Sequence, residues 1–141
     1  PREKSFKILI LISLVMTVFQ IGFGVQVREF VDLQINYWGL QKKSNWLAKA
    51  PNLFYIHRSF SLIVLAVNGF IGFKLLKNGQ VPLLFKCIML FIGLEILTGI
   101  MMYYFKFPFS TQPIHLFLAS LLFGAQSFFM IRIFKKYDFQ N

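Results

Sequence analysis

The sequence predicts an all-α membrane protein, a polytopic bundle of four transmembrane helices. Of its 141 residues, 57% are hydrophobic and 18% aromatic, which is more apolar side chain than a soluble domain this small can bury. The charged residues, only 14% of the chain, lie mostly between long apolar runs. These runs are long enough to cross about 30 Å of hydrocarbon as helices, and they lack the alternation of membrane strands.

Four spans are expected in one domain that covers residues 1–141. Their expected bounds are 8–27, 53–73, 81–105 and 114–131. The first span has no charged residue, the second is interrupted by His57 and Arg58 near its start, and the third carries Lys86 and Glu95. The stretch 28–52 is expected to form a long loop on the outer side of the membrane.

The positive charges predict how the spans are oriented. The chain has 15 Lys and Arg against five Asp and Glu, a formal net charge of +10. Nine positive residues would share one side with both termini, namely Arg2, Lys4, Lys7, Lys74, Lys77, Lys86, Arg132, Lys135 and Lys136. Six would lie on the other side, namely Arg28, Lys42, Lys43, Lys49, Arg58 and Lys106. The positive-inside rule then places both termini in the cytoplasm.

The same charges are interpreted as topology and headgroup signals, so membrane lipid is an expected partner and nucleic acid is not. The sequence has no nucleic-acid-binding motif, nucleophile triad, glycine-rich phosphate loop or paired carboxylates.

An internal repeat divides the chain into two related helix pairs. The first and third spans share a polar residue followed four residues later by glycine, at Gln20–Gly24 and Glu95–Gly99. The second and fourth spans share a histidine, a small residue and an amide on one helix face. These triplets are His57, Ser61, Asn68 and His115, Ala119, Gln126. The glycines are expected to permit close helix approach, and Gln20 is a candidate hydrogen-bond partner for the costly intramembrane carboxyl of Glu95.

The two histidines occupy matching positions and are expected at equal depth below the outer boundary. Two neutral imidazoles at one level on facing helices suit a six-coordinate heme iron, so His57 and His115 are the predicted metal ligands. Three positive residues expected near the outer rim, Arg58, Arg28 and Lys106, are candidate partners for the heme propionates.

Two other interpretations stay open at this point. The histidines can be interfacial residues whose ring nitrogens contact water in the headgroup layer, and Arg58 can simply extend outward to water. A zinc site is less favoured, because no Cys, Asp or third His lies at a ligand spacing in the second or fourth span.

Several segments together resemble the heme A synthase family of cytochrome oxidase assembly proteins, in a form close to that of Bacteroidetes-type bacteria. The likeness covers essentially the whole chain. It is carried by FQIGFGVQVRE at 19–29, IHR at 56–58, LEILTGI at 94–100, QPIHL at 112–116 and ASLLFG at 119–124.

The resemblance implies an enzyme of eight spans, built as two four-helix halves, that oxidises heme O to heme A in the bacterial inner membrane. One half carries a glutamate three residues before its histidine, where this chain has Phe54. The chain therefore resembles the C-terminal half, which holds heme b through two histidines, here His57 and His115.

This implication assigns the chain no catalytic residue of its own. Heme O and heme A would bind through a preceding half, and other cytochrome oxidase assembly proteins would be partners. The alternatives are a non-catalytic structural membrane subunit or a b-type heme electron carrier. The carrier usually needs two further histidines deeper in the bundle, and the chain has none.

Overall fold

The computed structural model describes residues 2–138, which form four long helices and one short 3₁₀ turn. The elements are α1 (Arg2–Trp38), η1 (Lys43–Asn45), α2 (Asn52–Lys77), α3 (Leu83–Tyr104) and α4 (Thr111–Asp138). This part of the chain has no strand, and each helix is long and apolar enough to cross a membrane. The all-α, four-span prediction is therefore confirmed.

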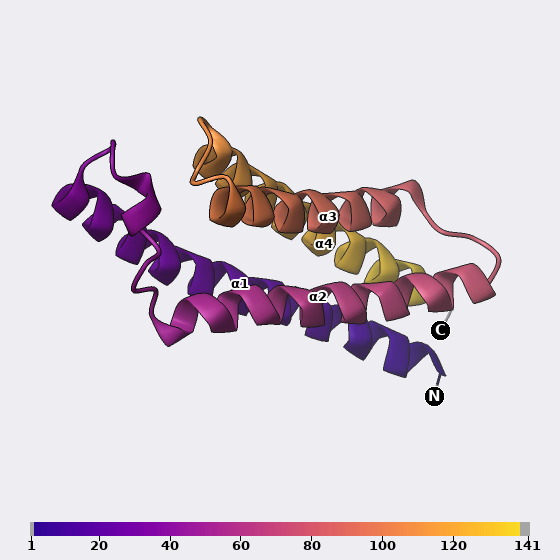
Figure 1. Cartoon of the computed structure of the whole chain (residues 1–141). Helices are drawn as coiled ribbons and strands as arrows, with labels where there is room; N and C mark the ends of the chain where they lie inside the picture. The colour runs from indigo at the N-terminus through magenta and orange to yellow at the C-terminus, as the bar shows by residue number, and fades with distance from the viewer. Residues whose placement is uncertain (1, 139–141) are drawn as a thin grey trace.

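The helices run up and down in sequence, each packed against its neighbours around the bundle. Contacts join α1 to α2, α2 to α3, α3 to α4 and α4 back to α1. Within residues 2–138 the diagonal pairs, α1 with α3 and α2 with α4, make no close backbone contact. Both ends of the chain and the α2–α3 connection lie at one end of the bundle, and the other two connections lie at the opposite end (Figure 1).

Prolines and glycines set the ends of the helices. Pro51 precedes α2 and Pro82 precedes α3, where an N-terminal position tolerates the missing backbone N–H. Gly39, directly after α1, and Gly79, just after α2, adopt positive φ angles of 75° and 89°. These are left-handed conformations that glycine adopts without a Cβ clash, so each glycine can turn the chain out of its helix.

The first helix is longer than predicted. Residues 28–38, expected in the outer loop, continue α1, whose 37 residues extend about 55 Å. Two pairs four residues apart support this extension: Arg28 donates to Asp32 at 2.9 Å, and Trp38 donates to Gln34 at 3.2 Å. Charge at residue 28 marks the edge of the apolar run, but a helix outside the hydrocarbon needs no apolar residues. The loop is therefore confined to residues 39–51.

That shorter loop folds back onto the α3–α4 turn in what we term the loop cap, formed by Val31, Lys43, Trp46 and Phe107. The rings of Trp46 and Phe107 lie 5.2 Å apart, and Val31 packs with both. Lys43 Nζ donates to the Phe107 carbonyl at 3.0 Å. Phe107 has a positive φ of 54°, a strained conformation that these contacts help to hold.

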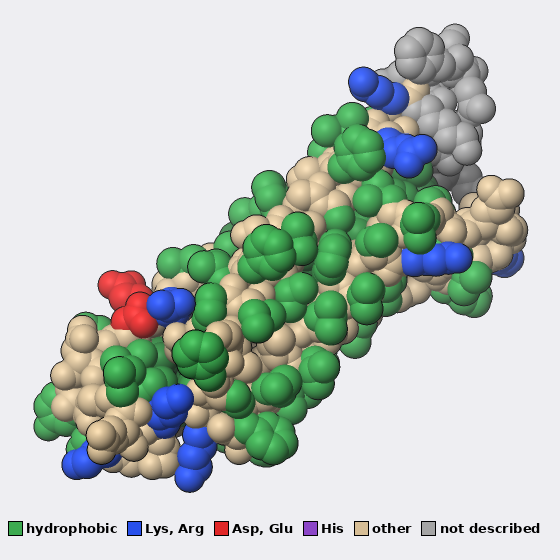
Figure 2. All heavy atoms as spheres, turned by 90° about the horizontal axis from the view of Figure 1, so that it is seen from above, with side chains coloured by type: hydrophobic (Ala, Val, Ile, Leu, Met, Phe, Trp, Pro, Cys, Tyr) green, Lys and Arg blue, Asp and Glu red, His purple; other side chains and the backbone are tan. Residues whose placement is uncertain are grey.

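The surface of the molecule suits a bilayer, and its interior is an apolar core. On the face shown in Figure 2, hydrophobic side chains cover the middle of the molecule and Lys and Arg gather towards its two ends. In the interior, Phe85 is 1% exposed and packs on Phe129 with ring centres 5.4 Å apart. Ile71 and Ile88 are buried in the same core cluster.

Candidate functional site

The two histidines face each other across the diagonal between α2 and α4. His57 lies in the second turn of α2 and His115 in the second turn of α4, both at the end of the bundle that carries the loop cap. Their ring centres are 6.5 Å apart and the ring planes are nearly perpendicular, at 79°. Both side chains are partly buried. The structure thus brings together the two residues that the repeat had paired.

His115 is held through both ring nitrogens by residues of α3. Its Nδ1 lies 2.7 Å from Thr98 Oγ1, and its Nε2 lies 3.2 Å from Glu95 Oε2. The partner expected for Glu95 was Gln20, and this expectation is wrong. Because α1 and α3 occupy opposite corners of the bundle, Glu95 reaches the histidine of the next helix instead.

His57 is held differently, by residues of α1. Gln20 Nε2 donates to the His57 backbone carbonyl at 2.9 Å, while the buried Nδ1 of His57 has no hydrogen-bond partner among residues 2–138. The repeat therefore relates contacts within the pairs α1–α2 and α3–α4. In each pair the polar residue of the first helix contacts the histidine of the second helix.

The two glycines of the repeat, Gly24 and Gly99, make room for imidazole rings. A Cβ on Gly24 would lie 3.1 Å from His57 Cε1, and one on Gly99 would lie 3.9 Å from His115 Cε1. Each glycine lies one turn beyond the polar residue of its helix, on the same face. We expected these glycines to let two helices approach each other closely. In the structure each glycine instead lets the imidazole ring of the neighbouring helix approach its backbone.

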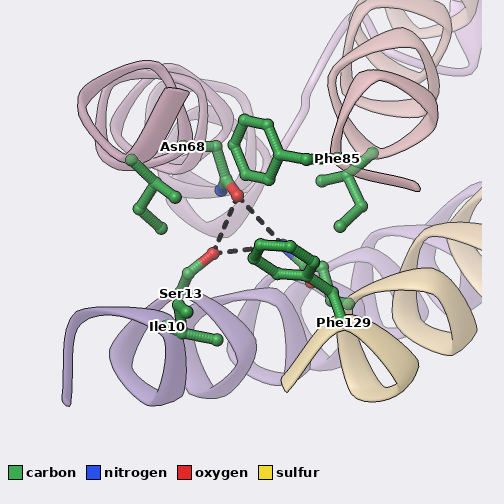
Figure 3. Close-up of a pocket in the computed structure, with 8 residues that line it drawn as sticks. Ile10, Ser13, Asn68, Phe85 and Phe129 are labelled. Carbon is green, nitrogen blue, oxygen red and sulfur yellow. Dashed lines mark hydrogen bonds between the residues drawn. The ribbon is translucent and has the colours of Figure 1, made fainter. Parts of the chain in front are cut away.

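A second polar level lies about 16 Å deeper along α2 and α4, eleven residues beyond the histidines. Asn68 Oδ1 accepts hydrogen bonds from Ser13 Oγ at 2.9 Å and from Gln126 Nε2 at 3.4 Å, and Gln126 Nε2 also lies 3.1 Å from Ser13 Oγ (Figure 3). All three side chains are buried, around a cavity of about 10 Å³. The sequence analysis missed Ser13, although it lies two turns before Gln20 on the same face of α1.

The positive residues predicted at the outer rim are placed apart from one another. Arg28 is exposed and paired with Asp32 on its own helix. The Arg58 guanidinium lies 5.1 Å from the ring centre of Tyr103, and Lys106 lies exposed in the α3–α4 turn with a φ of 58°.

The site is a histidine pair rather than a larger ligand cluster. Among residues 2–138, no group of three or more His, Cys, Asp or Glu side chains is arranged to hold a metal ion. What the site offers chemically is two facing imidazoles, a carboxyl beside one of them, and apolar walls.

Comparison with known proteins identifies the family. No curated protein and no solved structure matches the chain. The family model described as cytochrome oxidase assembly protein (COX15-CtaA) matches residues 1–127, which is most of the chain. This is the heme A synthase family, whose members are membrane oxidoreductases. The chain belongs to the COX15-CtaA family of cytochrome oxidase assembly proteins.

Proposed function

We propose that this chain is the heme-b-carrying half of a heme A synthase-like membrane oxidoreductase, with the substrate-oxidising site in another half. His57 and His115 are the axial ligands in this proposal, and Arg58, Arg28 and Lys106 are candidate propionate partners. Heme b held by these residues would supply a one-electron redox centre to the substrate-oxidising half, or would stabilise the assembly of the two halves.

The spacing of the two imidazoles carries the proposal. A metal-bound imidazole nitrogen lies about 2 Å from its metal, so the ring centres of two axial histidines lie about 6 Å apart. The ring centres of His57 and His115 are 6.5 Å apart. Nearly perpendicular rings are compatible with this arrangement, because each ligand can rotate about its own metal–nitrogen bond.

The immediate surroundings of His57 also fit a metal-binding role. The ring lies against the backbone of Gly24, where any larger residue would crowd it.

The residue three positions before His57 supports the location of catalysis in another half. The family resemblance places a glutamate at this position in the substrate-oxidising half. Here Phe54 is buried and stacks on Tyr103 with ring centres 5.7 Å apart and planes at 22°. A phenyl ring can neither accept a proton nor stabilise a cationic intermediate as a carboxylate does.

We also propose which side of the membrane the ends of the chain face and which membrane holds the chain. The excess of Lys and Arg on the side of the termini supports a cytoplasmic location for both ends, and the family resemblance supports the bacterial inner membrane. The loop cap and the histidine level would then face the periplasm.

The experiment is to express the chain in bacterial membranes, purify it in mild detergent and record its absorption and pyridine hemochrome spectra. The expected result is low-spin b-type heme, one per chain, and no conversion of heme O to heme A by the chain alone. A folded but colourless bundle would favour the structural-subunit alternative. Heme A detected by chromatography would show that this half is itself catalytic.

Substituting the glycine beside His57 is expected to weaken heme binding selectively. The added Cβ of Gly24→Ala would displace the imidazole, and we expect a roughly tenfold loss of heme affinity, the lower end of the cost of disturbing groups around a metal ligand. Gly99→Ala is expected to have little effect, because its Cβ lies in ordinary contact with His115 at 3.9 Å. Gly22→Ala is the matched control, because the added Cβ would have no atom of another described helix within 4 Å. Equal affinities for all three variants, measured by heme titration, would contradict this geometry.

A further inference from the structure

We infer that Thr98 determines which nitrogen of His115 is available to iron, and that the two axial positions are therefore unequal. The tautomer assignment stands on hydrogen bonds in this structure, whereas its consequence for heme rests on the function proposed above.

The hydrogen bonds of Thr98 define the direction of its contact with His115. Thr98 Oγ1 donates to the backbone carbonyls of Leu94 at 2.9 Å and Glu95 at 3.0 Å. A hydroxyl has one hydrogen, and these two carbonyls share it. The oxygen therefore presents a lone pair to His115 Nδ1 at 2.7 Å, so that Nδ1 carries the hydrogen and donates it.

This assignment leaves Nε2 as the ligand nitrogen of His115. A nitrogen that carries hydrogen has no lone pair for a metal, and in the neutral ring Nε2 is then unprotonated. In the structure Nε2 faces Glu95 Oε2 at 3.2 Å, so with this tautomer the Glu95 carboxyl is the protonated partner and donates its hydrogen to Nε2. The Glu95 carboxyl thus lies in front of the lone pair of Nε2, and its side chain would have to turn aside for His115 to bind a metal through this nitrogen. Thr98 can keep its hydrogen bond throughout, so it acts as a positioning residue.

The other histidine has no equivalent partner. Thr98 lies three residues after Glu95, and the matching position three residues after Gln20 is Phe23. Phe23 packs edge-on against Phe60 with ring centres 5.6 Å apart and cannot accept a hydrogen bond from His57. The Nδ1 of His57 accordingly lacks a hydrogen-bond partner in the part of the chain that the structure describes. Since a hydrogen bond from the outer nitrogen fixes a histidine ligand and raises its basicity, His115 is the stronger ligand and His57 the weaker.

A direct test reads the tautomer in the heme-free chain. In ¹⁵N NMR of the histidine-labelled protein in detergent, the imidazole shifts distinguish the Nδ1–H from the Nε2–H form. The inference expects Nδ1–H for His115, loss of this preference in Thr98→Val, and its return in Thr98→Ser. An Nε2–H tautomer in the parent protein overturns the inference, whether or not the chain binds heme.

A second test measures heme affinity and midpoint potential of the heme-loaded chain. Thr98→Val is expected to weaken heme binding by about 10- to 100-fold, the usual cost of losing an outer hydrogen bond to a metal ligand. A less basic ligand stabilises ferric iron less, so the midpoint potential rises, by about 59 mV for each tenfold loss of ferric over ferrous affinity. Thr98→Ser is expected to restore both values.

The control is Thr17→Val, which removes the same hydroxyl from a buried threonine that donates to Ser13 O within its own helix. It is expected to leave affinity and potential unchanged. If the parent binds heme and Thr98→Val matches it in both measurements, the positioning role is overturned while the proposed function stands. If the parent binds no heme, the proposed function fails and the consequence for the axial ligands fails with it.

Discussion

Replacing either histidine with alanine is expected to remove low-spin heme from the purified chain. An iron porphyrin held between two imidazoles loses half of its axial ligation when one is truncated. The expected loss of affinity exceeds the roughly 10- to 100-fold that removal of an outer hydrogen bond costs. Hemochrome content and electron paramagnetic resonance report the outcome, because a bis-imidazole spectrum requires both ligands.

The unequal surroundings of the two rings predict unequal effects. His115→Ala removes the ligand oriented by Thr98 and leaves the partly buried Glu95 carboxyl without its ring partner. His57→Ala removes a ring whose Nδ1 has no hydrogen-bond partner among the described residues. We therefore expect His57→Ala to retain some five-coordinate, high-spin heme, and His115→Ala to retain less.

Rescue by imidazole separates loss of a ligand from loss of the fold. His57→Gly and His115→Gly open a space at the ligand position, and free imidazole is expected to restore the low-spin spectrum in each. Circular dichroism of all four variants should match that of the parent. Normal low-spin spectra in both alanine variants would contradict ligation by these residues.

The features that follow from local sequence were predictable, and the helices are the clearest case. The apolar runs fix where the chain crosses the bilayer, because the hydrocarbon demands roughly 20 apolar residues per helix. The period of the helix also brought His57, Asn68 and their counterparts onto matching faces. These pairs meet in the structure because the two helix pairs are related by the repeat.

The features that depend on helix packing were not predictable. Aligning Gln20 with Glu95 identifies equivalent positions, but equivalent residues on diagonal helices need not touch, and these two contact histidines instead. The contact between Thr98 and His115 was not predictable, because nothing in the sequence distinguishes a threonine that contacts a histidine of another helix from any other threonine in a span. The extension of α1 to Trp38 was missed because the apolar signal ends where the bilayer does, whereas the helix continues until Gly39.

Removing Asn68 from the deeper polar level is expected to destabilise the bundle by about 2 kcal/mol. Single interhelical hydrogen bonds in membranes are worth about 0.6 kcal/mol on average and up to about 1.7 kcal/mol. Asn68→Leu removes the acceptor of two such bonds and leaves Ser13 and Gln126 buried with fewer partners. Unfolding in mixed micelles measures the change. Ser120→Ala is the control, because that exposed hydroxyl donates to the Leu116 carbonyl of its own helix and to no other helix among residues 2–138.

A double-mutant cycle distinguishes a network from a set of separate bonds. Once Asn68 is leucine, Gln126 has already lost one acceptor, so Gln126→Leu is expected to cost less than it does in the parent. Strictly additive losses would contradict the network.

The deeper polar level also bears on the histidines. The side chains of Asn68 and Gln126 link α2 to α4, whose backbones make no close contact, and thereby fix the axial register of these two helices. The histidines lie eleven residues away on those same helices, so a slip of one residue would shift one ring by about 1.5 Å relative to the other. Asn68→Leu is therefore expected to broaden the heme spectrum as well as lower the stability, although Asn68 lies about 16 Å from the histidine level. A variant that loses stability but keeps the parent spectrum would show that contacts at the histidine end of the bundle are enough to keep the two imidazole rings at the same level.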